Sequence, residues 1–243
     1  RAEDIESILQ PDRLRLPIVY RLTRKIINVV KNILPGNTIV TATSGRMEEI
    51  QVTLAHAESR DSELAWVWRQ AQRFAETGHP SVVVLPGHPA VQDFMGFVAQ
   101  SEGFVSLKFP RGNFGNPNYT KANEVFLESS VGPCLQYLGN SYGSLEDADS
   151  RPIVYVMTYH SIKGLDFRTV FLPLLTMDAV FWKTTDIDRR LFFVGATRSR
   201  RDLFLSYHGR EPHQYVQDMP QEELHKIEID QANATSIEED FVF

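Results

Sequence analysis

Apolar residues along this chain follow two spacings, one typical of amphipathic helices and the other of buried strands. Helical spacing is found in four segments, most of them bounded by Pro, Gly or a capping residue. The predicted helices cover residues 23–34, 61–78, 89–103 and 186–199. The predicted strands, which are short apolar or alternating runs, cover residues 49–57, 81–86, 104–109, 153–158, 168–175 and 202–209.

Strands and helices alternate along most of the chain, which favours an α/β fold with a mostly parallel sheet and helices on both faces. The continuous apolar run at 81–86 supports this fold, because such runs mark strands that are covered on both sides. Residues 110–123 are rich in Gly, Pro and Asn and are predicted to form a loop, and 124–143 to hold a short helix. Trp66 and Trp68 lie two apart on a predicted helix, so at most one is expected to face the core.

Negative charge is concentrated near the carboxyl end of the chain. Residues 221–243 hold seven acidic residues and one lysine, which accounts for the whole formal charge of −6. The rest of the chain is balanced, so the net acidity does not argue against nucleic-acid binding by the folded body. We therefore predict a solvated acidic segment over 211–243, which is a candidate for binding a protein partner.

Cysteine content and the length of apolar runs exclude several classes of protein. The single cysteine, Cys134, cannot form an internal disulfide, and no Cys/His cluster has the spacing of a metal site. This usage is typical of a reducing compartment, so a cytoplasmic location is expected. The longest apolar runs are strand-sized and far below the ~20 residues of a membrane span, so no membrane partner is expected.

Polar residues able to do chemistry gather after the predicted strand at 153–158. Thr158, His160, Lys163, Gly164 and Asp166 follow one another within nine residues. Ligands of open parallel sheets bind at the carboxyl ends of strands, and we expect all five residues to lie just past such an end. Their chemistry suits the handling of a nucleotide or phosphate, and a polar connection between strands is the alternative.

Three stretches carry a family resemblance. "MTYHSIKGLDF" (157–167) resembles motif V of UvrD/Rep-type superfamily 1 helicases, and "DRRLFFVGATRS" (188–199) resembles their motif VI, whose pattern is Arg-Arg-Leu-x-Tyr-Val-Ala-x-Thr-Arg-Ala. "LPIVYRLTRKII" (16–27) is similar to motif IV, although Val19 and Leu22 depart from its pattern. The motifs occur in the family's order, and the resemblance spans about residues 14–208.

The resemblance implies a RecA-like P-loop NTPase fold, and specifically the second of two such domains. No Gly-x-x-x-x-Gly-Lys-Ser/Thr loop occurs in the sequence, so the chain lacks its own Walker A loop. We expect residues 1–13 to be a linker from a missing N-terminal motor domain, 14–210 to be the second RecA-like domain, and 211–243 to be the acidic segment.

The resemblance also implies roles at an ATP site shared by the two domains. Arg21 and Arg198 match arginines that reach the γ-phosphate in relatives, so both are the predicted catalytic residues. Such arginine fingers stabilise charge that develops on the transferred phosphoryl group. Tyr20, Gly164 and Asp166 match positions near the nucleotide, where Asp166 stands in place of a glutamate that contacts the ribose.

The remaining motif residues are expected to contact DNA or to act structurally. Thr158, His160 and Lys163 fall in the stretch that contacts single-stranded DNA in relatives. The other arginines of motif VI are predicted to be peripheral to the phosphate: Arg189 and Arg190 as braces that bind neighbouring acids, Arg200 and Arg201 as solvated bystanders or weak contacts to a nucleic-acid backbone.

The predicted function is the second motor domain of an ATP-dependent DNA helicase or translocase that moves 3′ to 5′. The predicted cofactors are ATP and Mg²⁺, and the predicted partners are single-stranded DNA and the N-terminal RecA-like domain. The isolated chain is expected to be inactive as an ATPase, because the Walker A cradle is absent from it. The alternative is a non-catalytic helicase-like module that binds DNA or a protein.

Overall fold

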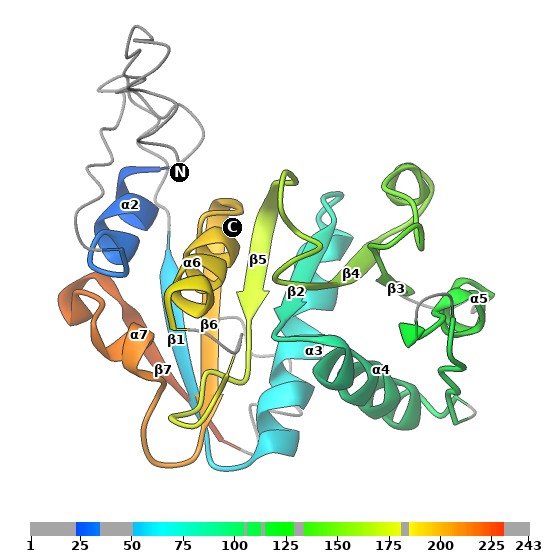
Figure 1. Cartoon of the computed structure of the whole chain (residues 1–243), viewed down its shortest axis with the longest axis horizontal. Coiled ribbons are helices and arrows are strands. Elements are labelled where there is room, and N and C mark those ends of the chain that lie inside the picture. Colours follow the sequence, from blue (N-terminus) through cyan, green and yellow to red (C-terminus); the bar gives the residue numbers. More distant parts are fainter. Residues whose placement is uncertain are drawn as a thin grey trace, which may run out of the picture.

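In the computed structural model of the chain, one seven-stranded sheet runs through the residues described, which are 23–34, 51–104, 106–112, 115–128, 134–180 and 185–230. Every strand pair is parallel, and the strand order is β3-β4-β2-β5-β6-β1-β7 (Figure 1). The strands are β1 (Val52–Ala57), β2 (Ser81–Leu85), β3 (Cys134–Tyr137), β4 (Ile153–Thr158), β5 (Phe167–Leu172), β6 (Ser199–His208) and β7 (His225–Ile229). We call the side on which the strands begin the amino edge, and the side on which they end the carboxyl edge.

Helices cover both faces of this sheet. Among the described residues they are α2 (Arg24–Val30), α3 (Arg60–Glu76), α4 (His88–Ser101), α5 (Thr120–Leu127), α6 (Thr185–Ala196) and α7 (Gln214–Gln217). Helices α3 and α4 contact each other on one face, whereas α2, α6 and α7 lie together on the other (Figure 1). For helices that connect strands, this division follows from right-handed crossovers, because the chain moves in one direction along the sheet from β1 to β3 and in the other from β3 to β7.

Local sequence signals account for the helix that follows β1. The hydroxyl of Ser59 accepts a hydrogen bond from the backbone N–H of Ser62 and so caps the start of α3. Trp66 and Trp68 are both buried, so the prediction that at most one faces the core is wrong. Trp66 packs edge-on against Phe204 of the sheet, whereas the indole N–H of Trp68 donates to Glu102 Oε1, just after α4, over 2.6 Å.

Predicted and observed elements differ mainly where apolar residues are few or isolated. The described residues of 104–109 form no strand, although their apolar positions alternate. Strand β3 was not predicted, because its four residues lie in a segment with weak periodicity. The sheet also continues beyond residue 210, since β7 pairs with β1 from Thr53 opposite His225 to Ala57 opposite Ile229. The acidic segment therefore supplies one strand of the folded domain.

Candidate functional site

The end of helix α6 holds the side chain of Arg198 in a fixed position at the amino edge. Arg198 Nε donates a hydrogen bond to the carbonyl of Val194 over 3.0 Å, and Nη2 lies 3.4 Å from Thr197 Oγ1. A cationic side chain is favoured here, because the last carbonyls of a helix lack partners and carry partial negative charge. The guanidinium is therefore anchored through Nε and Nη2, and Nη1 is directed to a partner beyond the helix.

That partner is Asp166, which immediately precedes β5. The backbone N–H of Phe167 donates to the carbonyl of Arg198 over 3.0 Å, which holds the starts of β5 and β6 side by side. Asp166 Oδ1 lies 3.5 Å from Arg198 Nη1, and Asp166 Oδ2 lies 3.7 Å from Arg200 Nη2. One largely buried carboxylate thus faces two arginines at the amino edge.

Gly164 lies two residues before this carboxylate. Its φ is +91°, a conformation that residues with a side chain rarely adopt. A Cβ at this position would meet nothing within 4 Å, so within this chain glycine is required by the backbone turn and not by a close neighbour. Gly164 and Lys163 are both exposed, which leaves the turn open to a ligand.

The other motif V residues begin at the opposite, carboxyl edge, where β4 ends. Thr158 is buried, and its Oγ1 accepts from the backbone N–H of Ser161 over 3.1 Å and lies 2.9 Å from Ser161 Oγ. The hydroxyl therefore shapes the turn that follows the strand. His160, in contrast, is exposed at the surface of this turn.

Residues 159–166 connect these two edges. Thr158 pairs with Leu85 at the end of β2, whereas Thr169 of β5 pairs with Ser81 at the start of β2. The connection therefore crosses the full depth of the sheet, because β5 is parallel to β4 and must begin at the amino edge. The prediction that all five polar residues lie just past one strand's carboxyl end is wrong for Asp166, which lies at the amino edge.

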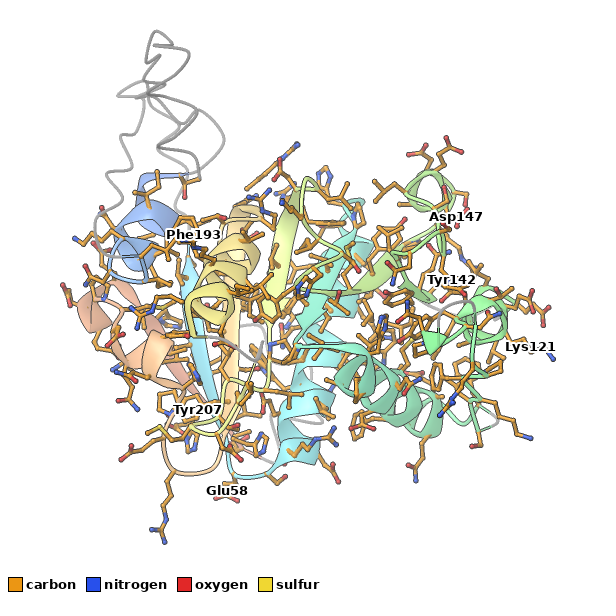
Figure 2. All side chains as sticks on the ribbon, in the orientation of Figure 1. Glu58, Lys121, Tyr142, Asp147, Phe193 and Tyr207 are labelled. Atoms are coloured by element: carbon orange, nitrogen blue, oxygen red, sulfur yellow. The ribbon has the colours of Figure 1, made fainter. Side chains whose placement is uncertain are left out.

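Close packing joins this crossover to α6. The ring of Tyr159 is fully buried against the backbone of Gly195, and a Cβ on Gly195 would lie 2.4 Å from Tyr159 Cε1. Burial raises the pKa of the Tyr159 phenol well above its ordinary value. Figure 2 shows the two edges at the scale of side chains, with Glu58 and Tyr207 at the carboxyl edge and Phe193, near the end of α6, toward the amino edge.

Comparison with known proteins shows what this part of the chain is similar to. Residues 129–210 match the model of the UvrD-like helicase C-terminal domain, and this range contains β4, the crossover, β5, α6 and β6. This part of the chain is therefore UvrD-like. The match ends before β7, so the sheet of this UvrD-like domain extends beyond the matched range.

Sequence relatives of the UvrD-like domain are helicases. An ATP-dependent DNA helicase Rep of Buchnera aphidicola subsp. Schizaphis graminum is 33% identical over 87 residues, which cover 29% of this chain and 13% of the relative. A probable DNA helicase II homolog of Rickettsia conorii is 35% identical over 63 residues, which cover 22% and 10%. The matched stretches are thus a small part of each relative's length.

A solved structure supports the fold over most of the chain. The C-terminal domain of a possible DNA helicase from Lactobacillus plantarum WCFS1 superimposes with a TM-score of 0.54, over 85% of this chain and 98% of that one, at 14% sequence identity. The two share a fold. The predicted α/β class, a RecA-like domain with a parallel sheet covered on both faces, is confirmed.

The motif VI arginines of the UvrD-like domain differ from one another in their contacts. Arg189 Nη1 donates to the carbonyl of Ile33 over 3.3 Å, and its guanidinium lies 5.1 Å from the centre of the Tyr215 ring. It braces α6 against α2 and α7, but its described partners are a carbonyl and a ring instead of the acids that were expected. Arg190 is exposed, and Arg201 Nε lies 3.8 Å from Asp202 Oδ1.

Arg200 is the residue at this site that sequence reasoning missed. It was predicted to be a bystander, but it shares the carboxylate of Asp166 with Arg198. The signal was present in the spacing, because residues two apart in an extended segment point to the same side. Tyr20 and Arg21, the predicted companions at this site, lie outside the described residues.

A second polar cluster of the UvrD-like domain lies at the carboxyl edge and was also missed. Glu63, on the first turn of α3, is fully buried, and its Oε1 accepts from the backbone N–H of Leu174 and from Ser206 Oγ, each over 2.7 Å. Its Oε2 lies 2.6 Å from His208 Nδ1. The cluster ties α3 to the ends of β5 and β6, and no pattern in the sequence points to it.

Metal-binding and membrane-spanning features were sought in the described part of the chain. Within it, no three His, Cys, Asp or Glu side chains come together in a way that could hold a metal ion. No described helix combines the length and the apolar character that crossing a membrane requires.

Proposed function

We propose that this chain is the second motor domain of an ATP-dependent DNA helicase or translocase that moves 3′ to 5′ on single-stranded DNA. The observation that carries the proposal is the anchored guanidinium of Arg198 at the amino edge, joined through residues 159–166 to the turn at the carboxyl edge. The similarity of residues 129–210 to the UvrD-like helicase C-terminal domain and the helicase names of the sequence relatives support it.

Arg198 is the proposed arginine finger. A planar cation with several N–H donors can hold two oxygens of a phosphoryl group as negative charge develops there. Fixing its Nε on the carbonyl of Val194 reduces the conformational freedom that the side chain would lose on binding ATP. In related chemistry such an arginine accelerates phosphoryl transfer by about 10³–10⁵-fold.

The rest of the proposed ATP site is shared between domains. Arg21 is the proposed second finger, Tyr20 and Gly164 the proposed neighbours of the nucleotide, and Asp166 the acid next to Arg198. The arginines suit the phosphates of ATP, whereas the described residues form no cluster for Mg²⁺. We therefore assign Mg²⁺ and the phosphate cradle to an N-terminal RecA-like domain, where bound Mg²⁺ would neutralise charge on the phosphates.

Single-stranded DNA is the proposed ligand of the turn that follows β4 and of Lys163, farther along the crossover. His160 and Lys163 are exposed and supply donors for phosphate oxygens. Thr158 contributes by shaping the turn through Ser161, since its hydroxyl is already hydrogen-bonded within the chain. The crossover 159–166 then links DNA contact at one edge to the arginine at the other.

Replacing Arg198 by Ala in a protein that carries both motor domains tests this function. DNA-stimulated ATP hydrolysis should fall by about 10³-fold or more, because charge on the phosphoryl group loses its main cation from this domain. Arg201→Ala is the matched control, since Arg201 lies three residues away and contacts Asp202, and its turnover should stay close to that of the unchanged protein. Circular dichroism should show both variants folded.

Two results would contradict the proposal. Turnover that survives Arg198→Ala would remove the assigned finger. Robust DNA-stimulated hydrolysis by the isolated 243-residue chain would show a nucleotide site that does not need a second domain. A protein that binds single-stranded DNA with no ATP turnover at all would favour the non-catalytic module instead.

A further inference from the structure

The carboxylate of Asp166 divides its two oxygens between two arginines. Oδ1 faces Arg198 Nη1 at 3.5 Å, and Oδ2 faces Arg200 Nη2 at 3.7 Å. Two oxygens of one phosphate group would present themselves to two guanidiniums in a similar way, because carboxylate and phosphate share the bidentate geometry that arginine recognises. The Asp166 side chain is only 9% exposed, so it occupies the inner part of this arrangement.

Charge and exposure at this cluster favour the arrival of an anion. Two guanidiniums face one carboxylate, so the three groups together carry a net positive charge. Arg200 is 64% exposed, whereas Arg198 is 11% exposed and anchored on Val194. Arg200 can therefore turn toward a ligand in solvent. Arg198 can stay in place and exchange the carboxylate oxygen at Nη1 for an oxygen of the ligand.

We propose that Asp166 is an internal placeholder for a phosphate group, and that Arg200 is a second phosphate-binding arginine beside Arg198. The proposal deepens the proposed function, because the phosphate belongs to the polyphosphate chain of a nucleoside triphosphate. When the phosphate enters, both guanidiniums exchange a carboxylate oxygen for a phosphate oxygen. Until the ligand arrives, the carboxylate of Asp166 occupies the place of the phosphate between the two arginines.

Asp166 and the ligand compete for the same two arginines, so the proposal predicts the direction in which each substitution changes the affinity for a polyphosphate. Removing the negative charge of Asp166 should strengthen binding of a polyphosphate, whereas removing the positive charge of Arg200 should weaken it. A merely structural carboxylate would act in the opposite sense, because its loss would disorder the arginines and weaken binding.

The experiment is titration calorimetry of the 243-residue chain with inorganic tripolyphosphate at low ionic strength. Asp166→Asn should bind roughly three- to tenfold more tightly, and Arg200→Gln roughly three- to tenfold more weakly, as expected for the gain or loss of one partly screened charge pair. Asp166→Glu, which restores the charge, should return the affinity toward that of the unchanged chain. Arg201→Gln is the control and should bind nearly as the unchanged chain does.

The measured affinities of these variants decide whether Asp166 and Arg200 act as proposed. Weaker binding by Asp166→Asn, or unchanged binding by Arg200→Gln, overturns the proposal. If Asp166→Asn does not fold, Arg200→Gln still decides, because that side chain is mostly exposed and its loss leaves the fold intact. The readout needs no ATP turnover, so the predicted affinities can hold even if Arg198→Ala leaves hydrolysis by the two-domain protein unchanged.

Discussion

Gly195 shows how a single missing side chain sets the packing between two motifs. The family pattern of motif VI has alanine at this position, yet here the ring of Tyr159 fills the space that a Cβ would need. The crossover that carries motif V therefore lies closer to α6 than an alanine would allow. The two positions are coupled, because a larger residue at 195 requires a smaller one at 159.

Gly195→Ala should destabilise the domain by about 1–3 kcal/mol, the usual cost of overpacking a tight core. Helix propensity alone predicts the opposite sign, since alanine is favoured over glycine in a helix by roughly 1 kcal/mol. Gly96→Ala in α4 is the matched control, because a Cβ there meets nothing within 4 Å, and it should leave stability unchanged or raise it. Chemical denaturation measures both changes.

The coupling can be checked by adding Tyr159→Ala. Tyr159→Ala alone should cost about 3–5 kcal/mol for the cavity it leaves. The double variant should lose less than the sum of the two single losses, because the ring no longer meets the new methyl group. Additive losses would contradict the contact.

Residues also show what could be predicted from sequence at this scale. Arg198 could be singled out because its motif has a fixed order of residue types, and its role as a finger stays a prediction. The pairing of Asp166 with Arg198 and Arg200 could not, because it depends on β5 and β6 starting side by side. The burial of both Trp66 and Trp68 escaped prediction for the same reason, since α3 is covered by the sheet and by the end of α4 together.

At the level of elements, a histidine outside the recognised motifs adds a side-chain contact between strand β7 and the sheet. His56 of β1 lies between Glu228 of β7 and the carbonyl of Gly209, at 2.6 and 2.7 Å from its two ring nitrogens. Burial lowers the pKa of His56, but the Glu228 carboxylate and the Gly209 carbonyl raise it by more, so the net shift is upward. The protonated imidazole therefore holds the neighbouring strands together.

This pairing should make part of the domain's stability depend on pH. Because the pKa of His56 is higher in the folded chain than in the unfolded one, its contribution is fully present below the unfolded value of about 6.5 and is lost as pH rises through the folded value. Glu228 is largely exposed, so the contribution should stay below about 1 kcal/mol. The difference in unfolding free energy between the unchanged chain and His56→Gln should therefore be larger at pH 6 than at pH 8.

The control for this pH dependence is Glu228→Gln, which should flatten the difference between His56 and its glutamine variant. The other titratable groups of the chain are common to all the variants and largely cancel when the curves are subtracted. A difference that grows as pH rises would contradict the assignment.

For the molecule as a whole, the alternation of helices and apolar strands was sufficient to predict the class of fold. Runs such as "VVVL" and "IVYVM" are buried on both faces of the sheet, so their apolar character is continuous and easy to recognise. The extent of the domain was harder to predict. Charge in residues 211–243 suggested a solvated segment, yet residues 214–229 supply α7 and β7, because a strand at the side of a sheet needs few apolar residues.

Truncation tests this extent of the domain. A chain that ends at Arg210 loses five buried apolar residues, namely Tyr215, Val216, Met219, Leu224 and Ile229. At about 1.5–3 kcal/mol for each buried side chain, this loss is comparable to the whole net stability of a typical domain. The shortened chain should show no cooperative thermal unfolding, whereas a chain that ends at Asp230 should unfold cooperatively. Equal melting temperatures for the two chains would contradict this view.

The placement of β7 also bears on how copies of this protein behave toward one another. An outermost strand offers unpaired backbone groups to any passing strand, and charged side chains are a common defence against such pairing. On β7, the side chains of His225, Lys226 and Glu228 are exposed. On β1, the strand that β7 covers, Val52, Leu54 and Ala55 are buried. The charged side chains of β7 should therefore hinder the pairing of this outermost strand with a strand of another chain.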